Sequence, residues 1–386
     1  MVFRLARKYP TLLFLLVTSC YWASMYVYVP TMPVHAENLG ASMGLIGTIV
    51  GAYGIFQLLL RIPLGVWSDR IGLRKPFILG GIAMAGIGAL GLGLSPQPEW
   101  LVVWRAVAGM GAAAWVAFSV FFSSYFPQDK VARAMGYVSF ASSGSQLVAT
   151  YAGGRIAENW GWEAPFFAGA IMAVLGLLIA LPLEEKPLVV QREMNLKEIQ
   201  RIATTPLLLV VSIACMLIQW AQWGTSSGFT LVYASHLGAT RSDLGMLTTV
   251  VYIGHMPAAL LIDRIAGRFG SRMTAFTGLI LQAVAIAMVP MTDSVSMIAL
   301  TQVIGGVGRG LTYPLLMALS IQSVPARDRA TAMGVFQAIY ALGMFAGPAS
   351  VGLLADSFGL LSVFAISTAA CLAGAALIIS KVPSKL

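Results

Sequence analysis

The sequence predicts an all-α integral membrane protein on three observations. Hydrophobic residues make up 58% of the 386-residue chain and charged residues only 10%, whereas about a quarter of the residues in soluble proteins are charged. The apolar residues gather in long runs that, as helices, reach across the ~30 Å hydrocarbon core of a bilayer. The second half of the chain also repeats landmarks of the first half, 198 residues further on.

Twelve apolar runs account for most of the chain, and each is expected to form one membrane-spanning helix. Their approximate limits are 11–33, 43–66, 76–95, 99–124, 134–157, 164–183, 205–231, 243–263, 273–291, 295–323, 331–354 and 361–380. No small-residue cleavage site follows the first run, so it is expected to be a retained span rather than a signal peptide. All three cysteines lie inside runs, which predicts neither a disulfide framework nor a metal site.

Residues 184–204 form a long polar segment that divides the runs into two sets of six. The sequence therefore predicts an N-terminal six-helix bundle over 1–183, a cytoplasmic linker over 184–204 and a C-terminal six-helix bundle over 205–386. The repeat supports this division, because Asp69–Arg74 aligns with Gly267–Arg272 and Ala134–Gly136 aligns with Ala332–Gly334. A repeat in the same orientation indicates two halves related by an axis along the membrane normal.

Lysine and arginine residues set the expected orientation, because cytoplasmic loops carry an excess of both. With the N-terminus inside, 19 of the 24 fall on the cytoplasmic side, and the other five are Arg61, Arg105, Arg155, Arg241 and Arg309. The net charge of +9 therefore reflects topology and predicts no nucleic-acid partner. The chain is expected to be a multi-pass protein of a bacterial inner membrane, with both termini in the cytoplasm.

The turn between the second and third runs reads Gly-x-x-x-Asp-Arg-x-Gly-x-Arg, from Gly65 to Arg74. This order resembles the loop 2–3 signature of the major facilitator superfamily of transporters. The resemblance implies that family's fold, in which two pseudo-symmetric six-helix bundles surround a central cavity that opens to each side of the membrane in turn. Two positions depart from the family pattern, since Trp67 replaces an aliphatic residue and Leu73 replaces a basic one.

In that family the turn is thought to act as a latch between the bundles. The resemblance assigns the latch to Gly65, Asp69, Arg70, Gly72, Arg74 and Arg133. Asp69 is the informative member, because an acid adds nothing to topology but pairs with a cation or a helix N-terminus on a neighbouring helix. The alternative is that the turn only fixes topology. The second copy carries Gly267 in place of the acid, which predicts a one-sided latch.

Three arginines lie inside runs, where a guanidinium is costly and usually faces water, a partner or a substrate. Arg105 is followed by small residues, similar to the span 4 motif of the family, and Arg309 is flanked by glycines near the middle of its run. Both are expected to contact the substrate, and the alternative for Arg105 is snorkelling to the outer surface. Arg61 lies about one turn from the end of its run and is expected to anchor at the cytoplasmic surface.

The first and seventh spans line the cavity in the family, and here both carry polar and aromatic residues. Trp22 and Tyr26 are four residues apart and share a helix face, as do Gln219 and Trp223. An aromatic belt at the membrane interface is the alternative, but amides within the bilayer favour a cavity. The expected substrate-binding set is Trp22, Tyr26, Arg105, Gln219, Gln222, Trp223, Arg309, Gln337 and Tyr340.

The positions of the acidic residues argue against assigning the family's proton antiport to this chain. Many proton-driven members carry a carboxylate inside the first or fourth span, and this chain has none there. The candidates for proton coupling are His255, inside the eighth run, and Asp263, at its inner end. A lone histidine in an apolar helix is more often a packing residue, which is the alternative for His255. The fifth span also lacks the Gly-Pro pair often found in the family's antiporters.

The expected function is secondary-active transport of a small organic solute, amphipathic or anionic, by alternating access. Export is the leading version, with protons as the candidate coupling ion. The alternatives are an organic-anion uptake permease, a lipid or lysolipid flippase, and a membrane receptor without transport. The chain shows no Ser/His/Asp set, metal-ligand spacing or phosphate-binding glycine loop, so we expect no enzyme activity, catalytic residue, metal or cofactor. It is expected to act as a monomer in the lipid bilayer, with the solute and protons as its partners.

We predict that Asp69→Asn shifts the balance between outward-open and inward-open states about tenfold, because a hydrogen bond to a charged group contributes about 1.5–3 kcal/mol. Distances between spin labels placed on the two bundles measure this balance. An unchanged distance distribution would show that the turn only fixes topology.

Overall fold

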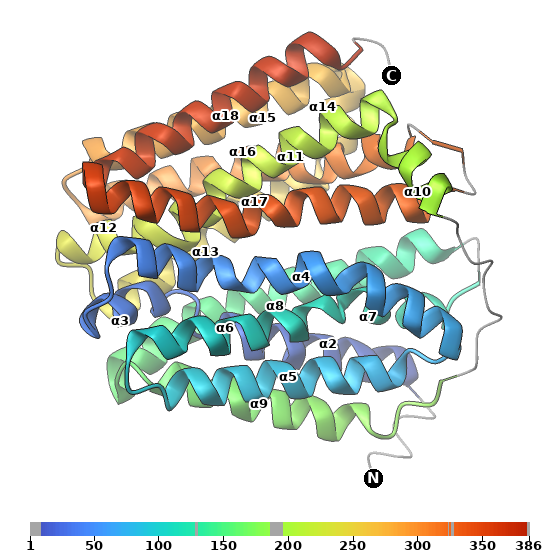
Figure 1. Ribbon diagram of the computed structural model, residues 1–386, viewed down its shortest axis with the longest axis horizontal. Helices are drawn as coiled ribbons and strands as arrows, with labels where there is room; N and C mark the ends of the chain where they lie inside the picture. Colours follow the sequence, from blue (N-terminus) through green and yellow to red (C-terminus); the bar gives the residue numbers. More distant parts are fainter. Residues whose placement is uncertain (1–8, 128–129, 186–195, 323, 326–327, 384–386) are drawn as a thin grey trace.

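The computed structural model describes residues 9–127, 130–185, 196–322, 324–325 and 328–383. Within these residues the chain is helical apart from short turns, and the long helices run side by side along one axis (Figure 1). Several of these helices begin with proline at their first or second position, where the missing N–H group has no intrahelical partner to lose.

The first six predicted runs coincide with one helix or with two consecutive helices. These helices are α2 (Pro10–Tyr26), α3 (Met32–Asn38), α4 (Met43–Ile71), α5 (Lys75–Gly93), α6 (Pro98–Ala113), α7 (Trp115–Ser123), α8 (Val131–Trp160) and α9 (Ala164–Ala180). The fourth run is divided between α6 and α7 by the single residue Ala114. α4 extends five residues beyond the predicted limit of its run at residue 66.

The second half repeats this arrangement after a short linker helix. Its elements are α10 (Leu196–Ala203), α11 (Pro206–Gly224), the π-helical turn η2 (Thr225–Phe229), α12 (Thr230–His236), α13 (Arg241–Leu260), α14 (Ile262–Phe269), α15 (Ser271–Met288), the 3-10 turn η3 (Val289–Met291), α16 (Val295–Gln322), α17 (Arg329–Phe358) and α18 (Leu361–Lys381). α13 and α14 meet at a bend of 58°. Residues 186–195 of the predicted linker lie outside the described residues.

Eight helical segments in the described part of the chain are long and apolar enough to cross a membrane, or nine if the bent pair α13–α14 counts as one span. The number is below the twelve predicted spans for two reasons. α2 and α9 are only 17 residues long, and α8, although 30 residues long, carries several serines and Gln146 along its length.

Glycines in the left-handed backbone region confirm the repeat. The glycines with positive φ among the described residues form three pairs, each 198 positions apart, and all lie in turns at helix ends. The pairs are Gly40 with Gly238, Gly72 with Gly270, and Gly161 with Gly359. Since this backbone region carries no steric penalty for glycine alone, the duplicated turns require the same residue in both halves.

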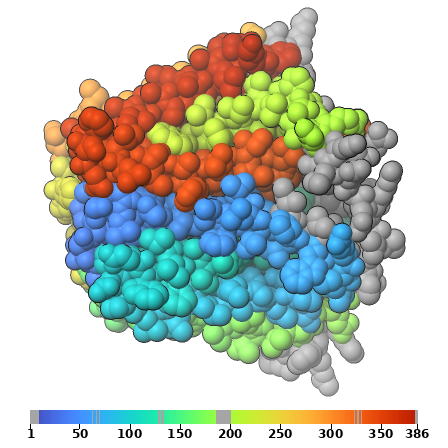
Figure 2. Space-filling view, viewed as in Figure 1, coloured from blue at the N-terminus to red at the C-terminus, as the bar shows by residue number. Residues whose placement is uncertain are grey.

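The two halves meet along two seams, where α4 packs against α17 and α8 packs against α13 (Figure 1). In Figure 2 the surfaces of α4 and α17 meet without a gap over the left part of the molecule. Glycine pairs allow this close approach: a Cβ added at Gly352 would lie 3.1 Å from the Cα of Gly47, and one added at Gly245 would lie 2.8 Å from the Cα of Gly154. The two glycine pairs are equivalent by the 198-residue repeat, so the seams are pseudo-symmetric.

Polar contacts reinforce the seams at the end of the molecule that holds α3 and α12. The Asp356 carboxylate accepts a hydrogen bond from the Gly44 amide at 2.9 Å, and Arg241 donates to the Ala157 carbonyl at 2.9 Å. His236 pairs with Glu37 at 2.7 Å. This end of the interface between the halves is therefore tightly packed.

Toward the opposite end, where α10 lies in Figure 1, glycines of the described residues have free space beside them, and we call this the loose end. A Cβ added at any of four glycines toward this end would have no atom within 4 Å among the described residues. These glycines are Gly65, Gly136, Gly267 and Gly334. The interface between the halves is thus closed at one end and loose at the other.

We predict that Gly47→Ala opens the closed end, because the new methyl group would overlap the Pro348 carbonyl oxygen. Overpacking of this kind costs about 1–3 kcal/mol, which the protein relieves by separating α4 from α17. In a background without native cysteines, a cysteine replacing the buried Met344 in this seam should then react about tenfold faster with a water-soluble maleimide. The control is Gly136→Ala, where space is free, and equal rates in the two variants would contradict the prediction.

Candidate functional site

Three arginines lie near the middle of helices at the centre of the molecule. Arg61 is ten residues before the end of α4, Arg105 is the eighth of the 16 residues of α6, and Arg309 is the fifteenth of the 28 residues of α16. None of the three forms an ion pair with a carboxylate of a described residue. Their partners are neutral amides, phenols and aromatic faces.

Arg61 connects the two halves. Its guanidinium donates to the Tyr340 hydroxyl at 2.6 Å and to the Gln337 side-chain oxygen at 3.2 Å, both on α17. It also donates to Gln57, one turn earlier on α4. The expectation that Arg61 anchors at the membrane surface is therefore wrong. Because α4 continues to Ile71, Arg61 lies about 15 Å from the end of its helix and is only 8% exposed.

Arg105 is held within the first half by two tyrosines. Its side chain is 1% exposed, and its guanidinium carbon lies 4.3 Å from the centre of the Tyr53 ring. A long hydrogen bond of 3.4 Å leads to the Tyr28 hydroxyl. This geometry excludes snorkelling to the surface, because the head group is enclosed by aromatic rings. A cation–π contact contributes about 0.5–2 kcal/mol, which does not offset the loss of water around a buried charge.

Arg309 meets the two amides predicted on the seventh span. With the Gln222 amide oriented so that its oxygen faces Arg309, this oxygen accepts from Nη1 at 3.0 Å and from Nε at 3.3 Å, and the Gln222 nitrogen donates to Gln219 at 3.2 Å. Tyr252 lies close to Arg309. Tyr252 in turn donates to Gln146 of the other half at 2.7 Å. Arg309, Gln219, Gln222 and Tyr252 form what we call the Arg309 cluster. This cluster contacts the other half through Gln146.

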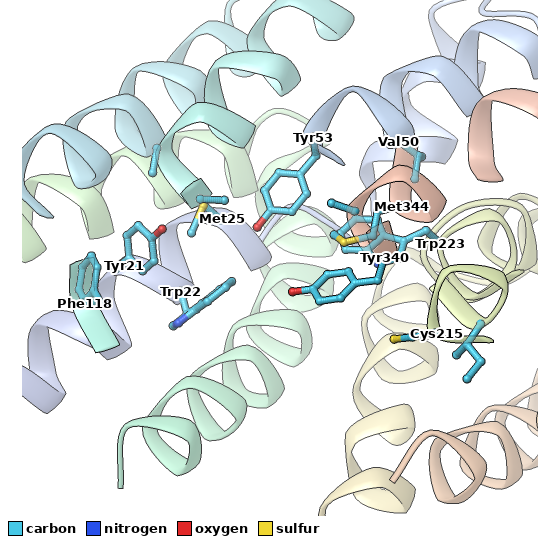
Figure 3. Packing of buried hydrophobic residues seen from close by; sticks show 14 of the residues in the cluster. Tyr21, Trp22, Met25, Val50, Tyr53, Phe118, Cys215, Trp223, Tyr340 and Met344 are labelled. Carbon is cyan, nitrogen blue, oxygen red and sulfur yellow. The ribbon is translucent and has the colours of Figure 1, made fainter. Parts of the chain in front are cut away.

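Aromatic rings separate the three arginines. Trp223 of α11 stacks on Tyr53 of α4 across the interface, with ring centres 5.3 Å apart, and Trp22 meets Tyr26 edge-on at 5.6 Å. Tyr26 also lies close to Tyr53. Figure 3 shows the hydroxyl groups of Tyr53 and Tyr340 directed toward one region between the halves, with Trp22 on its far side.

Hydrogen-bond donors outnumber acceptors in this central site. Buried donors that have no partner in the described part of the chain are Trp22 Nε1, Arg61 Nε and Arg105 Nε. An unpaired buried donor costs about 1–3 kcal/mol. A ligand that supplies acceptor oxygens and negative charge removes this cost, whereas a cation or a donor-rich ligand adds to it.

A small polar cavity of ≈ 20 Å³ adjoins the Arg309 cluster inside the second half, enough for about one water molecule. Gln222 contributes to its wall, together with hydroxyl groups from η2, α12 and α16. One of these, Thr230 Oγ1, is buried without a partner among the described residues. The cavity is therefore a polar extension of the site rather than a separate apolar pocket.

The two proton-coupling candidates lie in different surroundings. His255 is partly buried on α13, and its backbone carbonyl lies against Gly310, next to Arg309. Its Nδ1 atom has no partner among the described residues. Asp263 is exposed on α14, beyond the bend of α13, so the structure does not bring it to the central site.

The predicted latch turn makes hydrogen bonds within its own half. The backbone amides of Arg74 and Lys75 donate to the Glu185 carboxylate at 2.5 and 2.8 Å, and the Arg74 guanidinium donates to the Ser68 carbonyl. Gly72 forms the turn with φ of 71°, and Arg70 is exposed. The side chains of Asp69 and Arg133 lie outside the described part of the structure, so the latch between the halves stays a prediction.

The structure brings the nine predicted substrate-binding residues into one central region and adds residues that the sequence interpretation missed. Tyr53, Gln57 and Arg61 are spaced by four and form one stripe on α4, a polar pattern inside an apolar run that is visible in the sequence. Tyr252 gave no such signal, because a single tyrosine in an apolar helix is common at membrane interfaces.

Comparisons with known proteins agree with this architecture. A family model described as Major Facilitator Superfamily matches residues 14–231 and 211–385. The inner membrane transport protein YajR of Escherichia coli is 26% identical over 347 residues, covering 88% of this chain and 76% of YajR. The multi-drug resistance efflux pump PmrA of Streptococcus pneumoniae is 24% identical over 362 residues, covering 91% and 90%. Multidrug resistance protein 1 of Bacillus subtilis is 25% identical over 336 residues, covering 85% of each chain.

Solved structures share the fold at lower sequence identity. A bacterial homologue of the human lysosomal transporter Spinster, in an inward-facing and occupied conformation, superposes with a TM-score of 0.81 at 18% identity, covering 98% of this chain and 97% of the other. The nucleoside transporter NupG superposes with a TM-score of 0.78 at 14% identity, covering 96% and 97%. These similarities establish the arrangement of helices and leave the ligand open.

We predict that Arg105→Met leaves the thermal unfolding midpoint unchanged or raises it, while transport is lost. Methionine replaces a buried charge that has no carboxylate partner, and such replacements are often neutral or stabilising. The control is Arg241→Met, which removes a 2.9 Å hydrogen bond between the halves and should lower the midpoint. A larger decrease for Arg105→Met than for Arg241→Met would assign Arg105 a structural role instead.

Proposed function

The chain belongs to the major facilitator superfamily of membrane transporters, and on this premise we propose that it exports an anionic, amphipathic organic solute by alternating access. The protein is a multi-pass membrane transporter and not an enzyme. Substrate charge, substrate class and transport direction are inferred below from the central site and from the packing of the two halves.

The observation that supports an anionic solute is the set of three interior arginines without a carboxylate partner in the described chain. A buried guanidinium bonded only to neutral groups is far less stable than one that faces an anion, because attraction between charges strengthens as the local dielectric constant falls. A carboxylate, sulfonate or phosphate group on the solute supplies the missing charge. The unpartnered donors of Arg61, Arg105 and Trp22 supply hydrogen bonds to its oxygens.

The aromatic walls support an amphipathic solute. Trp22, Tyr26, Tyr53, Trp223 and Tyr340 surround the arginines with flat apolar faces. Such faces stack on an aromatic or other planar apolar body, while the polar head meets the guanidinium groups. The solute that fits best therefore has one anionic end and one apolar end.

The packing of the halves supports loading from the cytoplasm. With the N-terminus inside, as the distribution of basic residues predicts, the closed end with α3 and α12 faces outward and the loose end faces the cytoplasm. An inward-facing site is positioned to collect a cytoplasmic solute. Two relatives are named as efflux or multidrug resistance proteins and one as an inner membrane transport protein, which supports export across an inner membrane.

The support for proton coupling is a single residue, His255, and proton coupling stays a prediction. No acidic side chain of the described residues contacts the central site, so a carboxylate does not carry the proton there. His255 is the remaining titratable candidate at this depth, next to the helix segment that carries Arg309.

We predict that proteoliposomes containing the protein release naphthalenesulfonate at least tenfold faster than the neutral naphthalenesulfonamide. Arg309→Gln should raise the half-saturation concentration for the sulfonate at least tenfold, because a hydrogen bond to a charged group contributes about 1.5–3 kcal/mol. The control is Arg155→Gln, since Arg155 is exposed on α8 and distant from the Arg309 cluster. Equal release of the two compounds, or equal half-saturation in Arg309→Gln and the parent, would contradict the proposal.

The same vesicles test the coupling ion and the direction. Proton coupling predicts that an imposed pH gradient changes the rate of sulfonate release and that His255→Gln removes this response. A response retained in His255→Gln would exclude His255 as the coupling group. Uptake that exceeds release under every imposed gradient would favour the organic-anion permease instead.

A further inference from the structure

Arg61 lies at the boundary between the closed and the loose parts of the α4–α17 seam. Toward the closed end, Gly51 and Gly54 approach the α17 backbone so closely that a Cβ added at either would lie 2.5–2.8 Å from atoms of Phe345. Arg61 follows two turns later and bonds to Gln337 and Tyr340. One further turn along, Gly65 has no described atom within 4 Å of an added Cβ. The Arg61 contacts thus lie between the close-packed glycines of this seam and the free space beside Gly65.

These contacts consist of a charged donor and neutral acceptors. The Tyr340 hydroxyl and the Gln337 and Gln57 amides accept from the guanidinium, and the Nε donor of Arg61 remains unpartnered among the described residues. An anionic acceptor adds direct attraction between opposite charges to its hydrogen bond with the guanidinium, and this attraction is strong where the local dielectric constant is low. An anion that reaches Arg61 therefore competes successfully with the phenol and the amides.

Tyr340 also connects Arg61 to the helix that carries Arg309. The Tyr340 and Tyr313 rings meet edge-on, with their centres 5.9 Å apart. Tyr313 is four residues after Arg309 on α16, so the two side chains share one face of that helix. A change at Arg61 is therefore transmitted through two tyrosines to the helix of the second half that carries a guanidinium of the proposed binding site.

We propose that Arg61 is a charge-sensing tie between the halves, which an anionic group of the solute releases by taking the guanidinium from Tyr340 and Gln337. This inference rests on the proposed anionic substrate and adds a specificity rule to it. A neutral analogue enters the site and stacks on the aromatic walls, but it leaves the tie intact. Only an anion frees α4 from α17 and permits the movement that exposes the site to the other side.

Spin-label distances test this rule directly. The labels are attached to Gly80→Cys on α5 and Ser380→Cys on α18, two exposed positions in opposite halves and away from the seam, and an added Cβ at Gly80 has free space. The native cysteines, Cys20, Cys215 and Cys371, are replaced by alanine. The probes are naphthalenesulfonate and naphthalenesulfonamide, and calorimetry on the same samples measures their binding.

Naphthalenesulfonate should shift the distance distribution of the parent, and naphthalenesulfonamide should not. Tyr340→Phe removes one acceptor without changing Arg61, so its distribution should be shifted before any ligand is added. It should also bind the sulfonate more tightly, by up to about tenfold, because the anion no longer displaces the phenol. The control is Tyr137→Phe, at an exposed tyrosine, which should behave as the parent.

Arg61→Gln separates this inference from the proposed function. It should still bind naphthalenesulfonate through the remaining arginines, and the bound sulfonate should add no shift. A sulfonate-induced shift in Arg61→Gln equal to that of the parent, or an unshifted ligand-free distribution in Tyr340→Phe, would overturn the charge-sensing role alone. Absence of sulfonate binding to the parent would overturn the proposed anionic substrate and the role of Arg61 with it.

Discussion

Unpaired guanidinium charge in the interior is the constraint on which the central site depends. Arg61, Arg105 and Arg309 are placed where water is scarce, and their described partners carry no negative charge. Protein interiors tolerate such groups only when hydrogen bonds and aromatic faces surround them, which explains why glutamines and tyrosines gather on α4, α11 and α17. The three guanidinium groups meet no carboxylate among the described residues, and this supports the anionic substrate that we propose.

The internal repeat explains how the two halves fold and pack, whereas the charged residues of the central site are not repeated. The positive-φ glycines and the glycine pairs of the seams recur 198 residues apart, so both halves fold and meet by the same rules. The arginines do not recur. The position equivalent to Arg61 holds Ala259, and with the one-residue slip that aligns Gly109 and Gly111 with Gly306 and Gly308, the positions equivalent to Arg105 and Arg309 hold Gln302 and Ala112. A symmetric pair of bundles therefore encloses an asymmetric charge distribution, with two guanidinium groups in one half and one in the other.

In the mechanism that we propose, the seams link binding to movement because they combine two kinds of contact. Glycine pairs at the closed end give close backbone packing that a small displacement disrupts, since packed interfaces are bistable rather than continuously deformable. The Arg61 bonds beside them depend on charge and are open to competition from a ligand. An interface of apolar packing alone would have no means of responding to an anion, whereas this one places its responsive bonds where the helices begin to diverge.

The sequence by itself determined the membrane character, the repeat and the positions of most helices, because hydropathy and glycine placement report the local surroundings of the chain. The substrate-binding role of the nine expected residues stays a prediction. It misplaced Arg61, because the apolar run ends at residue 66 while the helix continues to Ile71, which moves the guanidinium from the surface to the interior. Only the tertiary structure decided which residues meet across the halves, such as Arg61 with Tyr340 and Tyr252 with Gln146. Those pairs are more than a hundred positions apart in the chain, and no local pattern encodes the register in which two separate bundles pack.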